Sequence, residues 1–182
     1  MYTNDVVEQV RNDIQHWILN FVEAPNPHYG GKFPVCPYAR QARLSGESSV
    51  KVYKSGSVKQ FIKKCADELY CDPVHSVLLI AFPPRVKYYP GIHRYIYNLD
   101  KQLVSRNLYA LGGLAVGTKS CYTGWFNRGE YFVVGINTLS NVLPAVESLK
   151  STEYYQNWSQ EHFHAIVDRR QKLYEKHGNP SK

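Results

Sequence analysis

The sequence has no run of apolar residues long enough to cross a bilayer, which takes about 20 residues. Its first residues enter an amphipathic pattern directly, without the basic segment and apolar segment of a secretory signal. Its four cysteines are too few and too scattered for the disulfide framework of a small secreted domain. We therefore expect a soluble, cytoplasmic protein with reduced thiols and no membrane partner.

Several catalytic signatures are also missing. The chain has no glycine-rich phosphate loop ending in Gly-Lys-Ser/Thr, no Gly-x-Gly-x-x-Gly, no Gly-x-Ser-x-Gly and no His-Glu-x-x-His. These absences argue against nucleotide hydrolases and serine hydrolases. No two cysteines have the close spacing of a zinc site, so we expect no metal, and the sequence leaves any cofactor unknown.

What the sequence does have is positive charge and tyrosine. The net charge is +7, but the basic residues are dispersed, which makes nucleic acid a less favoured partner than an anionic small molecule. The 15 tyrosines include groups near residues 88–97 and 122–126. Such rings stack on planar ligands, form hot spots for a protein partner, or line the edge of a core, and the sequence leaves these alternatives open.

The order of apolar patterns indicates alternating strands and helices. Apolar residues recur at helical spacing over residues 5–22, after a candidate N-cap at Asn4. After a loop rich in proline and glycine, the periods predict the following elements: strand 49–53, helix 58–69 opened by Ser57, strand 74–82, helix 90–108, strands 114–117 and 131–137, helix 141–149 and helix 159–177. The apolar stripe of the last helix includes one arginine, Arg170.

This order predicts an α/β (α+β) fold. We expect a single small central sheet of about four strands, with the β-α-β-α-β-β-α order and split β-α-β logic of ferredoxin-like folds. Extra helices precede and follow it. The prediction for residues 1–182 is one domain, consisting of an N-terminal helix at 5–22, a Pro/Gly loop at 24–44, an α/β core at 48–150 and C-terminal helices at 151–177.

The segment from Phe33 to Arg40 is the first candidate site. Proline favours the first position of a helix, so Pro37 predicts a helix with Cys36 as its N-cap. Unpaired N–H groups and the helix dipole would then lower the pKa of the Cys36 thiol. Arg40 lies one turn along, where it would stabilise a thiolate or hold an anion, and His28 would act as a base. The alternative is a buried structural cysteine beneath a tight turn.

The loop at 118–130 is the second candidate, because loops held by a sheet often carry binding residues. Its candidate ligand-binding residues are Cys121, Tyr122, Trp125, Asn127 and Arg128.

The segment Cys36-Pro37-Tyr38-Ala39-Arg40 resembles families of bacterial and phage proteins, domains of unknown function, that carry Cys-Pro-Phe/Tyr-Ala after an N-terminal helix. The similarity extends loosely over residues 12–150. This chain departs from the families' Tyr-Thr/Asn-Arg loop, because Gly124-Trp125-Phe126 separates Tyr122-Thr123 from Asn127-Arg128. The resemblance implies a fold and a candidate site but no reaction.

Two functions from different classes follow. The first is a small enzyme or a domain that binds an anionic ligand, with Cys36 as nucleophile or redox thiol and Arg40 orienting the anion. The alternative is a non-enzymatic interaction module, such as a phage-encoded modulator of a host protein, that uses the tyrosine-rich surface. Nucleic-acid binding is the third and weakest hypothesis.

Overall fold

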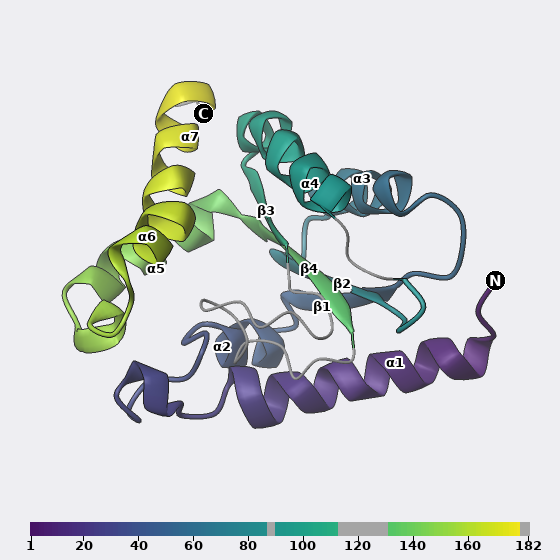
Figure 1. The fold of residues 1–182 in the computed structure, drawn as a ribbon, viewed down its shortest axis with the longest axis horizontal. Helices are drawn as coiled ribbons and strands as arrows, with labels where there is room; N and C mark the ends of the chain where they lie inside the picture. Colours follow the sequence, from purple (N-terminus) through teal and green to yellow (C-terminus); the bar gives the residue numbers. More distant parts are fainter. Residues whose placement is uncertain (87–89, 113–130, 179–182) are drawn as a thin grey trace.

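A four-stranded mixed sheet forms the centre of the molecule (Figure 1). The computed structural model describes residues 1–86, 90–112 and 131–178, without the side chains of His28 and Pro90. The strands are β1 (Ser48–Val52), β2 (Val77–Phe82), β3 (Leu108–Gly112) and β4 (Phe132–Thr138). No helix in the described ranges is both long and apolar enough to span a membrane.

The strands lie in the order β1-β2-β4-β3. β1 and β2 are parallel neighbours, whereas β4 is antiparallel to both β2 and β3. β2 and β3 therefore run in the same direction with β4 between them, which is the split β-α-β arrangement. The β-α-β-α-β-β-α order, the sheet of four strands and the α/β (α+β) class are confirmed.

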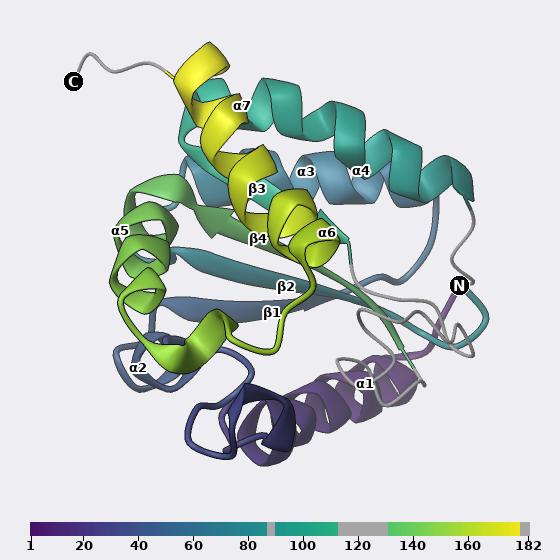
Figure 2. The same ribbon diagram turned by 60° about the vertical axis from the view of Figure 1, so that its left-hand side comes forward.

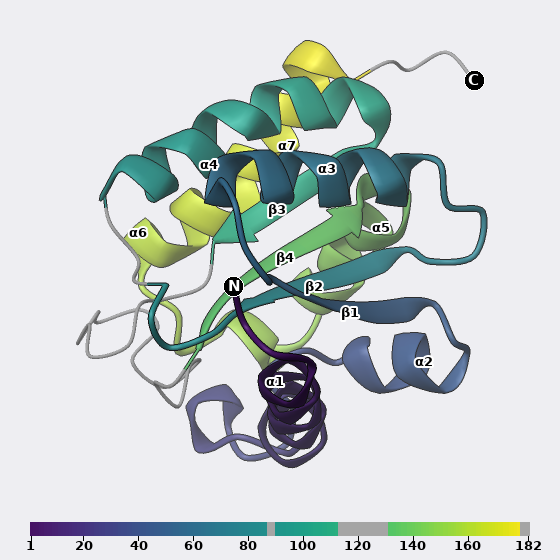
Figure 3. The same cartoon turned by 90° about the vertical axis from the view of Figure 1, so that its right-hand side faces the viewer.

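Two helices cover one face of the sheet, α3 (Val58–Tyr70) and α4 (Pro90–Leu103) (Figure 3). Their apolar stripes pack on alternate strand residues, including Ile80 of β2 and Val134 of β4, which are fully buried. Ser57 caps α3 by accepting a hydrogen bond from the Gln60 backbone N–H, as the sequence predicts. This face holds the largest hydrophobic cluster among the described residues.

The opposite face is divided between two groups of helices. Near the β1 side, α1 (Asn4–Trp17) places Val10 and Ile14 against Ala81 and Val133. On the β3 side, α5 (Leu139–Lys150) and α7 (Arg169–His177) pack around Tyr109. The short helix α2 (Ala39–Leu44) lies near the end of α1 (Figure 3).

The C-terminal helices lie together beyond the β3 edge of the sheet (Figure 2). A 3₁₀ turn at Glu153–Tyr155 precedes α6 (Gln160–Phe163). A π-helical segment (His164–Asp168) and then α7 follow α6 directly, so that the three form one continuous helix. Ser159 caps this run by accepting a hydrogen bond from the His162 N–H. A π segment shifts the faces that the following turns present, and here it comes directly before Arg169 and Arg170.

Several boundaries differ from the sequence prediction, including the start of β2, which begins at Val77 instead of residue 74. Thr3, not Asn4, caps the first helix, which becomes π-helical from Ile18 to Val22. The helix predicted at 90–108 is α4, and it ends at Leu103. A 3₁₀ turn follows, and Asn107 then adopts a left-handed backbone conformation with φ 60°. β3 begins at Leu108, inside the range predicted as helix. The strand predicted at 114–117 lies outside the described residues.

Candidate functional site

The loop before Cys36 is held against the end of the first helix. Pro25 and Pro34 form an isolated antiparallel bridge, and the Asn26 N–H donates to the Phe33 carbonyl at 2.9 Å. The Cys36 N–H then donates to the Val22 carbonyl at 3.1 Å. These backbone bonds give Cys36 a fixed position without regular secondary structure.

The prediction that Pro37 starts a helix capped by Cys36 is wrong by two residues. Pro37 lies in a turn closed by the Ala39 N–H and the Cys36 carbonyl at 3.2 Å. α2 begins at Ala39, and its N-cap is Tyr38, whose side chain does not bond to the helix end. The Tyr38 hydroxyl instead donates to the Ala145 carbonyl of α5 at 3.1 Å.

The pKa of the Cys36 thiol moves in the opposite direction from the prediction. Burial raises it, although the backbone N–H groups of Tyr38 and Ala39 and the charge of Arg170 act in the other direction. These N–H groups thus act in the predicted direction, although the Ala39 N–H also donates to the Cys36 carbonyl. Their effect is too weak to offset the loss of water, so the thiol is neutral at pH 7.

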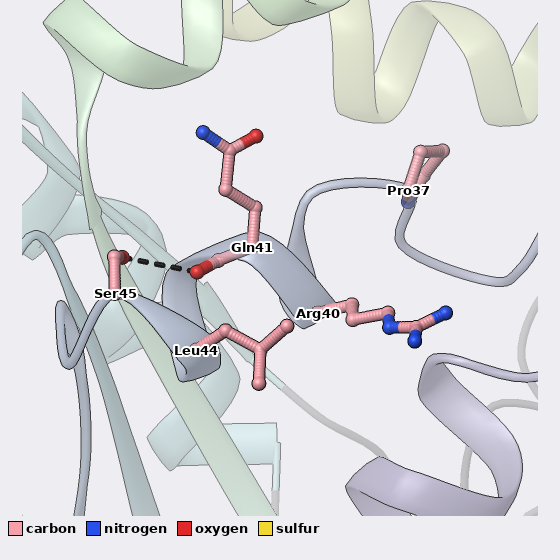
Figure 4. A pocket seen from close by; sticks show the side chains of 5 residues that line it. All are labelled: Pro37, Arg40, Gln41, Leu44 and Ser45. Carbon is pink, nitrogen blue, oxygen red and sulfur yellow. Dashed lines mark hydrogen bonds between the residues drawn. The ribbon is translucent and has the colours of Figure 1, made fainter.

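Arg40 lies on the exposed side of α2 (Figure 4). It lines a shallow hollow of about 510 Å³ with Pro37, Gln41, Leu44 and Ser45. Within the described ranges no hydrogen bond or ion pair involves Arg40. The charged residues with the largest effect on the Cys36 pKa are Arg170 and Glu23. The structure therefore brings Arg170, not Arg40, into electrostatic contact with Cys36.

The side chains of the other predicted site residues are not among those that the structure describes. The backbone of His28 belongs to a 3₁₀ turn, Pro27–Tyr29, but its side chain is not described. Cys121, Tyr122, Trp125, Asn127 and Arg128 lie in the undescribed range 113–130. Their predicted roles stay predictions.

Arg170 is the functional candidate that sequence reasoning missed. Only 6% of its surface is exposed, yet its Nε has no acceptor, and no hydrogen bond or ion pair to it occurs among the described residues. Its guanidinium lies over the ring of Tyr109, 4.9 Å from the centroid. The titratable side chains that influence its pKa most strongly are Tyr109, Tyr155, Asp100 and Cys36. An arginine on an apolar helix stripe was the available signal.

The neighbouring Arg169 is paired through its two Nη atoms, although its Nε, like that of Arg170, has no hydrogen-bond partner among the described residues. Its Nη1 donates to Asp100 Oδ2 at 2.9 Å and also to the Tyr109 hydroxyl, and its Nη2 donates to the Tyr97 carbonyl at 3.2 Å. The other oxygen of Asp100 accepts the Ala110 N–H at 2.8 Å. Asp100 is 1% exposed, and this burial raises its pKa to about 6 in spite of both partners. Asp100 thus has no oxygen free of a partner to offer Arg170.

Aromatic rings enclose the other side of Cys36. Tyr29 and Tyr154 stack with centroids 4.6 Å apart, and the Tyr154 hydroxyl donates to the Val35 carbonyl at 2.5 Å. Tyr155 packs edge-on against Tyr154 at 4.9 Å, and burial raises the pKa of Tyr155 to about 12. We call Cys36, Tyr109, Tyr155 and Arg170 the Arg170 cluster. It combines one buried cation with neutral donors and aromatic walls.

The predicted tyrosine-rich surface is used in part for internal contacts. The Tyr95 hydroxyl donates to the Lys59 carbonyl at 3.0 Å. Tyr97 is 46% exposed, and the Arg169 guanidinium lies over its ring, 4.0 Å from the centroid. Tyr88 and Tyr89 lie outside the described residues. A protein partner at this surface stays a prediction.

Comparison with known proteins finds no match for this chain among family models, curated proteins or solved structures. The resemblance carried by Cys36 to Arg40 stays a prediction, and the functional argument depends on the geometry of the molecule.

Proposed function

We propose that the protein binds a small anionic ligand at the Arg170 cluster. The observation that carries the proposal is the Arg170 guanidinium, which is 6% exposed and has no hydrogen-bond acceptor or ion-pair partner among the described residues. Burying an unpaired charge costs several kcal/mol or more, and buried arginines are normally paired. A ligand that supplies the missing negative charge would recover part of that cost.

The charges around Arg170 support an added anion. Arg169 and Asp100 form an ion pair, so the second positive charge on α7 is not balanced within the cluster. The groups next to Arg170 are phenols and a thiol, and burial raises the pKa values of Cys36, Tyr109 and Tyr155, so that all three are neutral at pH 7. They can donate hydrogen bonds to an anion without repelling it.

This proposal gives Cys36 a binding role in place of a nucleophilic one. A nucleophilic cysteine needs thiolate character, which electropositive and partly exposed surroundings supply. The burial of the Cys36 thiol works against it. The enzymatic alternative is therefore less well supported than ligand binding, and we place the protein in the cytoplasm, where such thiols stay reduced.

The test compares two arginine variants by thermal unfolding with and without sodium benzoate, acetate, sulfate and phosphate at constant ionic strength. Arg170→Met removes the buried cation, and Arg40→Met removes an exposed unpaired one with the same change of net charge. We expect at least one anion to raise the Tm of the wild type and of Arg40→Met, and not that of Arg170→Met. Equal shifts in all three proteins, or no shift with any anion, would overturn the proposal.

A second candidate function, protein binding, is favoured by the exposed face of α2. Leu44 is 68% exposed beside the hollow that Arg40 lines. Large apolar side chains at such hollows are typical anchors of interfaces. Leu44→Glu would abolish a stoichiometric complex with a protein partner, while Arg170→Met would leave it intact. A complex that survives Leu44→Glu would exclude α2 as the interface.

A further inference from the structure

The balance of charge at the Arg170 cluster restricts what kind of anion fits it. The ionised groups that act on one another around Tyr109 are Arg169, Arg170 and Asp100. Glu23, which acts on Cys36, and Glu147, which acts on Tyr155, are already paired with Arg43 and Lys150. Asp100 uses both oxygens, for the Ala110 N–H and for Arg169. The surplus is one positive charge. A single negative charge balances it, whereas a dianion would leave a negative charge facing Asp100 in surroundings of low dielectric.

The shape of the donor gives a second restriction. A guanidinium presents parallel N–H groups in a planar fork that matches the two oxygens of a carboxylate. The Nε of Arg170, on one edge of that fork, is buried and has no acceptor among the described residues. Phosphate sites usually combine several cations or backbone N–H groups. The other cation at Tyr109, Arg169, is already paired with Asp100.

The walls give a third restriction. The Arg170 guanidinium packs on the face of Tyr109, and Tyr155 continues into a group of rings formed with Tyr154, Trp158 and Phe163. The Cys36 side chain, which is partly exposed, adjoins the cluster with a neutral thiol. These walls offer neutral hydroxyl and thiol donors, but among the described residues they hold no second unpaired cation for another negative charge. The remainder of the ligand must therefore be uncharged, and the rings favour an apolar body.

We infer that the ligand is a monocarboxylate with an uncharged apolar body, held by the Arg170 guanidinium against Tyr109 and Tyr155 with the Cys36 thiol beside it. This inference rests on the proposed function and narrows it to one class of anion. It follows from the single unpaired cation, the planar donor and the aromatic walls.

The experiment is isothermal titration with three probes that share a phenyl body. Benzoate carries one charge, benzamide carries none, and phenyl phosphate carries close to two at pH 7.5. We expect saturable binding of benzoate that is about tenfold or more tighter than that of benzamide, and no tighter binding of phenyl phosphate. Arg170→Met should remove the preference for benzoate, Arg170→Lys should weaken it, and Arg40→Met should retain it.

A second readout places the probe. Saturating benzoate should slow the alkylation of Cys36, followed by peptide mass spectrometry, and leave the alkylation of the exposed Cys71 unchanged.

The outcomes distinguish the anion-binding function from the narrower inference that the anion is a monocarboxylate. Phenyl phosphate binding more tightly than benzoate, with both lost in Arg170→Met, would overturn the carboxylate inference and keep the anion-binding function. Benzoate binding that Arg170→Met does not affect, or that leaves Cys36 unprotected, would overturn the location and hence both claims. Equal binding of benzoate and benzamide would show that charge is not recognised, and no binding of any anion, including those of the thermal test, would overturn the function itself.

Discussion

Arg169 and Arg170 are adjacent in the chain, but only Arg169 forms an ion pair with Asp100, through an Nη1–Oδ2 distance of 2.9 Å. Arg169 thereby connects α7 to α4, which carries Asp100, and to β3, which carries Tyr109. Arg170 lies over the same Tyr109 ring without an acceptor among the described residues. We therefore expect the two guanidinium groups to contribute to stability with opposite sign.

Replacing each arginine by methionine should show this difference. At pH 7, Arg169→Met leaves the Asp100 carboxylate buried without its cation, so we expect the free energy of unfolding to fall by about 2 to 3 kcal/mol. Arg170→Met replaces an unpaired buried charge by an apolar side chain of similar length, so we expect no loss, and a gain of about 1 kcal/mol. Urea denaturation measures both.

Arg40→Met is the matched control for these two variants, because Arg40 is exposed and unpaired within the described ranges. It should change stability by less than about 0.5 kcal/mol. A loss in Arg170→Met as large as that in Arg169→Met would mean that Arg170 has a stabilising partner.

The stability of the protein should depend on pH through Asp100. Burial raises its folded-state pKa to about 6, while an unfolded aspartate titrates near 3.9, an estimate for model peptides. The folded state thus binds the proton more tightly. Its contribution is fully present below about pH 4 and is lost as the pH rises through about 6, a decrease of roughly 3 kcal/mol in the free energy of unfolding.

Asp100→Asn isolates this contribution, because the amide oxygen still accepts a hydrogen bond but does not titrate. The difference in stability between the wild type and Asp100→Asn should change by that amount between pH 4 and 7. Contributions of other groups are the same in both proteins and therefore cancel in the difference. Parallel pH profiles for the two proteins would show that Asp100 keeps an ordinary pKa in the folded state.

Most of the fold was predictable because its signals are local. The helical stripe after Ser57 and the apolar run that ends at Phe82 depend on neighbours within a few residues, and both elements appear in the structure. The end of α4 was not predictable in this way. Helical spacing of apolar residues continues to Leu108, whereas in the structure a 3₁₀ turn at Val104–Arg106 and the left-handed conformation of Asn107 separate helix from strand.

The candidate site was predictable only in part, because its properties depend on contacts between distant residues. The sequence indicated that backbone N–H groups after Cys36 act to lower its pKa, which they do. It did not indicate that burial would outweigh them, or that Tyr154 and Tyr155, more than one hundred positions away, would lie near the thiol. Arg170 was visible as a charge on an apolar stripe, but its lack of a partner requires coordinates.

The thiols should react with iodoacetamide in an order set by burial. At pH 8 we expect Cys71, which is exposed, to react about tenfold or more faster than Cys36, and Cys65 to react most slowly, because burial raises its pKa to about 11. Peptide mass spectrometry resolves the individual rates. A Cys36 that reacts faster than Cys71 at neutral pH would contradict the neutral thiol and restore the nucleophile hypothesis.

The hydroxyl of Tyr154 should control how firmly the Cys36 turn is held. It donates to the Val35 carbonyl at 2.5 Å, and both residues are buried, so Tyr154→Phe leaves that carbonyl without a partner. We expect a loss of about 1 to 3 kcal/mol in the free energy of unfolding. Tyr70→Phe is the matched control, because Tyr70 is 54% exposed.

Because Val35 precedes Cys36, Tyr154→Phe should also accelerate the alkylation of Cys36 without changing that of Cys71. A destabilised variant in which Cys36 reacts at the wild-type rate would show that the hydrogen bond stabilises the fold without shielding the thiol.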